Sequence, residues 1–303
     1  MTVDVDVPPG RPSPFGGLDP ADVGRAHRAI DPLHSQVYFA PDAEAAFVAA
    51  GLRPGRMPYF AGRAAPMGAV GPGVVAATFY NFNPELVARF IPRAWTLVPP
   101  ERVVQVRWEA AATSLRRLLG EDVAASPEVA ELGGLLRTAT AACRPEGRPL
   151  YAGHADLEWP TDPLLVLWHA TTLLREHRGD GHLGALAAAG LSGVEAIVTH
   201  TATGRGFRVE AAKQLRGWSD EQWSVAQDAL RERGILDADD GLTAEGAALR
   251  RWIEDRTDEL AAAPWAALGA EGTARVIALA KPLTRLVVAH GAFPDTVFAG
   301  PRS

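Results

Sequence analysis

The segment 175–182 (REHRGDGH) carries the densest set of chemically active side chains in this 303-residue sequence. It holds two imidazoles, two guanidiniums and two carboxylates within eight residues. Histidine exchanges protons near neutral pH, and arginine can clamp a carboxylate or a phosphate through paired hydrogen bonds. We therefore predict acid–base chemistry with His177, His182 and Asp180 as catalytic residues and Arg178 as a ligand-binding residue.

A structural interpretation of the same segment competes with the catalytic one. Cationic side chains at the end of a helix complement its dipole, Gly179 is a natural helix stop, and Asp180 can cap the helix that follows. A metal site is less well supported, because His177 and His182 are five residues apart and lack the i, i+4 spacing of helical zinc ligands. A third ligand, Asp180 or His200, is only a guess, so we predict no metal residues.

A second candidate site is aromatic and lies in the segments 59–66 (YFAGRAAP) and 77–82 (ATFYNF). Aromatic side chains in such a pattern usually form core, because they bury the most apolar surface. However, Arg63 stands among small residues, where a planar ligand could lie against an aromatic ring with its acidic end on the guanidinium. We therefore predict Tyr59, Arg63 and Tyr80 as ligand-binding residues.

The sequence contains no fingerprint of a common cofactor or nucleophile. It has no Gly-x-Ser-x-Gly elbow, no Walker motif and no dinucleotide-binding motif. The cofactor is therefore unknown, and a haem or a metal bound through one histidine stays open. Whether the protein is an enzyme stays open as well.

The composition indicates a folded protein. Hydrophobic residues make up 47% and charged residues 22%, and the formal net charge of −6 argues against a surface that grips nucleic acid over its whole extent. The single cysteine excludes an internal disulfide and a Cys-rich zinc site. Because no apolar run reaches bilayer-spanning length and no leader pattern opens the chain, we expect a cytoplasmic protein without a membrane partner.

Helices must position these residues, since the chain is rich in alanine and leucine and only 7% aromatic. Helix starts are predicted where capping residues precede apolar runs, at Asp19, Asn83, Ser192, Ser219 and Thr243. The segment 74–80 fits a strand or a buried helix. The predicted organisation, with its linker in the Pro/Gly-rich stretch around residue 148, is a disordered tail (1–20), an N-terminal domain (21–148) and a C-terminal domain (149–303).

The second half of the chain resembles a winged-helix domain. Residues 230–254 (LRERGILDADDGLTAEGAALRRWIE) are similar to the wing and following helix of MarR-type regulators, and 237–241 (DADDG) is predicted as a β-hairpin turn. The whole chain resembles a family of mostly uncharacterised actinobacterial proteins with such a helix-turn-helix, through the segments 59–66, 77–82 and 174–182. The resemblance implies a MarR-like winged helix but no particular activity.

A faint internal repeat extends this resemblance to the first half. AFVAAGL (46–52) matches ALAAAGL (185–191), and the helix starts at 83 and 219 correspond. If the repeat is a true duplication, the fold is mainly α, with two winged-helix-like halves in one chain, each with a small β-hairpin wing. Chance similarity in an alanine-rich chain is the alternative.

DNA is possible but disfavoured as a partner. The candidate recognition helix at 193–204 contains no Arg, Lys, Asn or Gln, and the candidate wing carries three aspartates. Against this, basic residues that follow the helix could contact phosphates, namely Arg205, Arg208, Lys213 and Arg216. We therefore expect the protein to bind a small, partly aromatic or acidic organic molecule between its halves, with acid–base catalysis as an option. The alternative is a MarR-like, ligand-responsive DNA-binding regulator. The ligand and the oligomeric state stay unknown.

Overall fold

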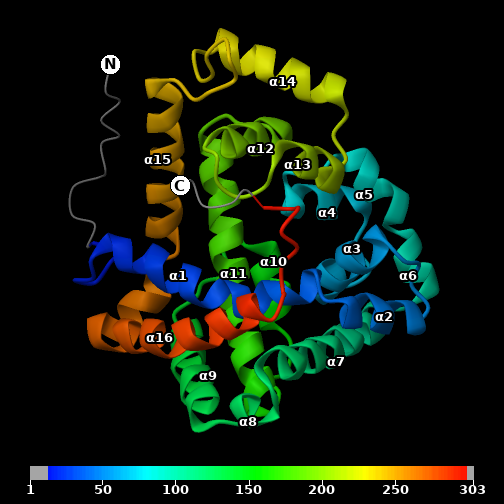
Figure 1. The fold of residues 1–303 in the computed structure, drawn as a ribbon, viewed down its shortest axis with the longest axis vertical. Helices are drawn as coiled ribbons and strands as arrows, with labels where there is room; N and C mark the ends of the chain where they lie inside the picture. The colour runs from blue at the N-terminus through cyan, green and yellow to red at the C-terminus, as the bar shows by residue number, and fades with distance from the viewer. Residues whose placement is uncertain (1–12, 299–303) are drawn as a thin grey trace.

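The computed structural model of the protein describes residues 13–298, and these residues form helices joined by short loops (Figure 1). The helices of the first half are α1 (Pro20–Ser35), α2 (Pro41–Ala49), α3 (Arg56–Ala64), α4 (Pro72–Phe79), α5 (Pro84–Phe90), α6 (Arg93–Leu97), α7 (Pro100–Leu119), α8 (Glu121–Ala124) and α9 (Pro127–Thr140), with the short 3₁₀ helices η1 (Gln36–Tyr38) and η2 (Ala65–Met67). Those of the second half are α10 (Pro149–Ala155), α11 (Pro163–Ala188), α12 (Gly193–Ala202), α13 (Val209–Arg216), α14 (Asp220–Glu232), α15 (Ala244–Leu260) and α16 (Ala263–Ala289).

Helix α11 is the central element of the fold. It runs through the middle of the molecule, with α12–α14 near one end and α8 and α9 near the other, while α2–α7 lie along one side (Figure 1). Its apolar residues join those of α1, α7, α9 and α16 in the largest buried cluster. Two smaller buried clusters lie within residues 47–150 and within α11–α15.

The continuity of α11 overturns the helix stop that its sequence suggests at Gly179. The helix starts at Asp162, whose carboxylate accepts a hydrogen bond from the Leu164 amide (2.9 Å), and it continues through Gly179 and Gly181. A β-carbon on Gly181 would lie 2.8 Å from the Arg148 guanidinium and 3.2 Å from Leu260. Gly181 is therefore small because other elements pack closely against α11, and not because the helix ends there.

The predicted fold class, two winged-helix-like halves with β-hairpin wings, is wrong. Within residues 13–298 there is no strand, and the only β pairing is two isolated bridges, Leu236↔Leu242 and Phe207↔Phe298. The Asp237 carboxylate accepts hydrogen bonds from the amides of residues 239 and 241 (2.9 Å each), which closes the turn tightly. Thr243 then caps α15, so the residues on either side of the turn form only the Leu236↔Leu242 bridge and are too few for a β-ladder. The helical part of the expectation is confirmed.

Other sequence expectations are confirmed or remain predictions. Caps form at Asp19, Asn83, Ser192, Ser219 and Thr243, and residues 74–79 belong to α4. Most of the predicted tail, residues 1–12, falls outside the described residues. The domain boundary near residue 148 stays a prediction.

No described helix is, taken alone, long and apolar enough to cross a membrane. Only α11 and α12 taken as a pair, which is bent by 98°, meet the length and composition criteria.

Candidate functional site

The two faces of α11 separate the residues that the sequence groups together. A helix turns about 100° per residue, so residues at i, i+3, i+4 and i+7 share one face. Arg175, Arg178 and His182 follow this spacing and line cavities beside α1, α3 and α15. His177 and Asp180 face α10 instead, because five residues from His182 back to His177 turn the side chain by about 140°.

His177 and Asp180 are held in contacts between α11 and neighbouring segments. The Asp180 carboxylate accepts a hydrogen bond from the Tyr151 amide (2.9 Å), and burial raises the pKa of Asp180 to about 6. His177 Nε2 accepts a long hydrogen bond from the Arg144 amide (3.4 Å), and burial lowers the pKa of His177 to about 3. Neither side chain lines the aromatic cavity or the polar cavity described below. The catalytic role predicted for them stays a prediction.

Two arginines share one buried carboxylate, that of Glu176 on α11. Arg63 donates to both Glu176 oxygens (3.1 and 2.8 Å), and Arg175 donates to one of them (2.8 Å). Burial alone would raise the pKa of Glu176, but the two guanidiniums lower it well below its usual value. Because one carboxylate faces two guanidiniums, this group retains net positive charge.

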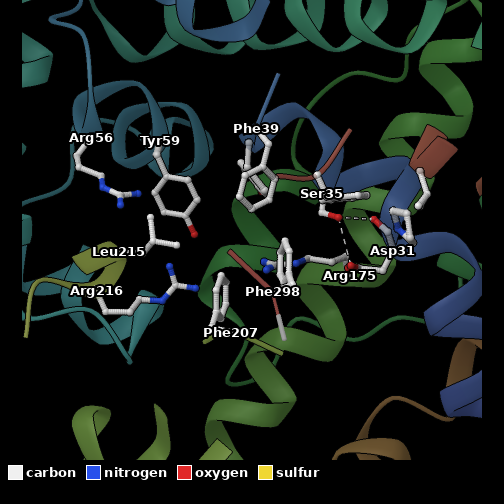
Figure 2. Close-up of a pocket in the computed structure, with 14 residues that line it drawn as sticks. Asp31, Ser35, Phe39, Arg56, Tyr59, Arg175, Phe207, Leu215, Arg216 and Phe298 are labelled. Carbon is white, nitrogen blue, oxygen red and sulfur yellow. Dashed lines mark hydrogen bonds between the residues drawn. The ribbon is translucent and has the colours of Figure 1, made fainter. Parts of the chain in front are cut away.

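The positive group borders a cavity of about 510 Å³, which we call the aromatic cavity (Figure 2). Its walls come from α1, η1, α3, α11, α13, the end of α16 and the segment after it. The lining residues are Asp31, Pro32, Ser35, Tyr38, Phe39, Arg56, Tyr59, Arg175, Phe207, Leu215, Arg216, Val288, Phe293 and Phe298. Figure 2 shows the Tyr59 hydroxyl and the Arg216 guanidinium pointing into the same space, with the rings of Phe39, Phe207 and Phe298 beside it.

Arg216 has no anionic partner in this cavity. Its guanidinium lies over the rings of Phe82 (4.3 Å to the centroid) and Phe207 (4.7 Å), and its buried Nε makes no hydrogen bond within residues 13–298. Burial lowers the pKa of Arg216, Tyr59 raises it, and the nearby Arg56, Arg63 and Arg175 lower it; together they bring it to about 10. Arg216 is therefore an uncompensated, largely desolvated cation.

The pKa of the Tyr59 hydroxyl indicates the same positive potential. Burial alone would raise the pKa of its hydroxyl, but Arg63, Arg216 and Arg175 bring the pKa of Tyr59 below its ordinary value of 10. A buried phenol ionises early only where positive charge dominates its surroundings. The aromatic cavity is therefore electropositive.

A second cavity of about 400 Å³, which we call the polar cavity, lies next to the first. The two share the wall residues Asp31, Tyr59, Arg175 and Arg216. The rest of the polar cavity is lined by His27, Arg28, Arg63, Thr78, Phe79, Asn81, Phe82, Arg178, Gly179, His182, Leu183, His200, Glu254 and Thr257. No group of three or more His, Cys, Asp or Glu side chains in residues 13–298 is arranged to hold a metal ion.

The profile of a helix-turn-helix family matches residues 23–294, which is most of the chain. The protein belongs to this helix-turn-helix family. Comparisons with curated proteins and with solved structures gave no match.

Within this helix-turn-helix protein, α13 and α14 form one helix–turn–helix unit, in which α13 ends at Gly217 in the left-handed conformation (φ 75°). The sequence points instead to residues 193–204 as the helix available to a duplex. Those residues form α12, whose residues 196–199 are buried, and a β-carbon on Gly193 would lie only 2.1 Å from the Tyr80 carbonyl oxygen. Helix α12 is therefore a packing helix, and α14 is the exposed one.

The exposed face of α14 is acidic. Arg231, the basic residue near its end, is paired with Asp228 and Asp240. The exposed charged residues along the helix are Asp220, Glu221, Asp228 and Glu232. Carboxylates on this face repel DNA phosphates and provide no donor for the base edges, so α14 lacks the charge that a recognition helix needs.

The structure brings together four of the seven site residues that the sequence singles out. Tyr59, Arg63, Arg178 and His182 all line the polar cavity, and Tyr59 also lines the aromatic one. Tyr80 lies elsewhere and donates its hydroxyl hydrogen to the Leu191 carbonyl (2.6 Å). His177 and Asp180 face α10.

Sequence reasoning missed the residues that dominate the aromatic cavity. Arg216 was noted only as a possible phosphate contact, and no local pattern places it opposite Arg56 and Tyr59. The aromatic residues Phe293 and Phe298 near the end of the chain were the available signal, since large aromatics outside any periodic helix pattern often line a site.

Proposed function

We propose that this helix-turn-helix protein binds a small organic anion with an aromatic part in the aromatic cavity. The observation that carries the proposal is Arg216, a cation without an anionic partner between two aromatic rings. A ligand carboxylate, sulfonate or phosphate would supply the missing charge, and its ring would pack among Tyr59, Phe207 and Phe298. The volume of about 510 Å³ suits a ligand of this size.

Binding is better supported than catalysis. Of the three predicted catalytic residues, His182 lines the polar cavity, whereas His177 and Asp180 line neither of the two cavities described above. Its Nδ1 is hydrogen-bonded to Thr257 Oγ1 (2.8 Å), and burial lowers its pKa to about 4. The imidazole is therefore neutral at pH 7 and suited to hydrogen bonding, whereas a general acid or base would be expected to titrate near neutral pH.

The test compares a matched acid and amide. We expect 2-naphthoate to bind at least about tenfold more tightly than neutral 2-naphthamide by titration calorimetry, because only the acid can pair with the arginines. Arg216→Met should remove this preference, and Arg216→Lys should retain part of it. Arg102→Met, at an exposed arginine, serves as the control.

Aryl sulfonates and phenyl phosphate extend the panel beyond carboxylates. Equal binding of anions and their neutral analogues throughout the panel would refute the proposal. Unchanged anion affinity in Arg216→Met would refute it as well.

A second candidate function is DNA binding, which membership of a helix-turn-helix family favours. The exposed basic side chains Arg205 and Arg208, at the start of α13, could contact a phosphate backbone. We would then expect the duplex upstream of its own gene to bind with an affinity that falls steeply between 50 and 200 mM salt. Arg205→Met should reduce that slope. No binding at 50 mM salt would exclude this function.

A further inference from the structure

The polar cavity offers neutral hydrogen-bonding groups that nothing in the protein satisfies. Within residues 13–298, neither the His200 imidazole nor the Asn81 side-chain amide makes a hydrogen bond, and His182 uses only Nδ1. Burial lowers the pKa of His200 and of His182, so both rings are neutral at pH 7. Neutral imidazoles and amides each present a donor and an acceptor, which matches hydroxyl or amide groups of a ligand.

Buried positive charge without a full set of partners is concentrated at the wall between the two cavities. Arg28 also lines the polar cavity, but its side chain is exposed to solvent, which screens its charge. Arg178 is paired with Asp258 and lies 3.8 Å from Glu254. At the shared wall, Arg216 has no carboxylate partner and Arg175 shares Glu176 with Arg63. The Asp31 carboxylate also lies on this wall and offsets part of the charge.

We propose that the ligand is amphipathic and occupies both cavities. This inference rests on the proposed function. The aromatic part of the ligand lies in the aromatic cavity, one anionic group sits at the shared wall between Arg175 and Arg216, and a neutral head with hydroxyl or amide groups lies in the polar cavity beside Asn81, His182 and His200. The ligand class is therefore an aromatic group joined to a polyol or an amide-bearing group through an anionic linkage such as a phosphodiester.

The physical reason is that each part of such a ligand matches the charge and polarity of the part of the two cavities that surrounds it. A simple aromatic acid fills one cavity and leaves His200 and Asn81 without partners. A ligand with a charge at its outer end would place that charge beside Arg178, which Asp258 already neutralises. Only an anion in the middle of the ligand meets the cations at the wall while the ends meet apolar and neutral polar surroundings.

The experiment uses two phosphodiesters of equal charge and similar length. Phenyl glyceryl phosphate carries two hydroxyls in its head, and phenyl propyl phosphate carries none. We expect the glyceryl diester to bind about tenfold more tightly to the parent protein by calorimetry. Asn81→Leu and, separately, His200→Leu should reduce this preference to about twofold or less, while each variant keeps the parent affinity for phenyl propyl phosphate.

The outcomes separate this inference from the function on which it rests. Equal affinity of the two diesters in the parent, or an unchanged preference in both variants, would overturn the inference of an amphipathic ligand. In that case, binding of phenyl phosphate that depends on Arg216 would still uphold the proposed function. If neither the diesters nor phenyl phosphate binds, both fail. Two variants are used so that misfolding of one, seen in its thermal melt, leaves the other as the test.

Discussion

Replacing Arg216 by methionine should stabilise the protein in the absence of ligand. Loss of a buried charged residue usually lowers stability, because a partner charge is left behind. Arg216 has no such partner, and its buried Nε makes no hydrogen bond within the described chain. Methionine has a similar length and can pack against the rings of Phe82 and Phe207.

The size of the effect follows from the pKa of Arg216. Burial lowers this pKa from 12.5 to about 10. Because the pKa of a cation is lowered in the folded state, the charged form destabilises the fold at neutral pH, by about 3 kcal/mol at ~1.4 kcal/mol per pKa unit. Water in the cavity screens part of this cost, and the lost cation–π contacts offset about 1 kcal/mol of the gain. We expect a net gain of about 1–2 kcal/mol in the free energy of unfolding.

Thermal and urea melts without ligand measure this gain. A chain of this length should melt roughly 2–5 °C higher as Arg216→Met. Arg102→Met, which removes an exposed arginine paired with Glu109 (3.1 Å), should leave the melting temperature unchanged. 2-Naphthoate should raise the melting temperature of the parent and not that of Arg216→Met. A variant that melts at or below the parent, with the control unchanged, would show that the cation is already compensated.

Three further predictions concern buried groups around the cavities. Arg63→Met should lower the free energy of unfolding by about 3–5 kcal/mol in urea titrations, because it leaves Glu176 with only one of its three charge-assisted hydrogen bonds. Unchanged stability would contradict the shared-carboxylate account. The pKa of His177 is lowered to about 3 in the folded state, so between pH 6.5 and pH 5 the unfolded state takes up a proton that the folded state does not, and the parent protein loses stability. His177→Gln should reduce this loss by about 2 kcal/mol. Parallel stability profiles of parent and variant would refute that assignment. Tyr59 should be the first of the four tyrosines to ionise in an ultraviolet absorbance titration, because burial raises the pKa of the other three, and Tyr59→Phe should remove this first step.

The starts of the helices that follow Asp19, Asn83, Ser192, Ser219 and Thr243 could be predicted from the sequence because capping is a local interaction. Ser192 and Ser219 accept hydrogen bonds from amides three residues ahead, as their capping patterns indicate. The predicted β-hairpin at 237–241 is absent for a reason that is also local but is not visible in the sequence pattern. Asp237 forms two side-chain bonds to its own turn, and this closes the loop before a ladder can form.

The composition of the cavities could not be predicted, because it depends on contacts between distant segments. A run of charged residues with two glycines looks like a turn, and only tight packing around Gly181 explains why α11 continues. Once α11 is continuous, its period separates His177 from His182 and turns Arg175 toward the cavity. Arg216 joins the site only because α13 docks on the first half of the chain, and no spacing pattern in the sequence encodes that docking.

The docking of α13 explains how a helix-turn-helix unit can position a cation inside the protein. The carbonyls of Arg216 and Gly217 accept hydrogen bonds from the backbone and side-chain nitrogens of Asn83 (2.9 Å each), and Trp218 donates to the Asn81 carbonyl (2.9 Å). The turn between α13 and α14 is thus fixed to the first half, which aims Arg216 inward and leaves the acidic face of α14 outside. A duplex-binding unit requires the opposite arrangement, with cations outward. The inward direction of Arg216 is therefore the feature of this unit that supports the proposed binding of an anion in the cavity behind the turn.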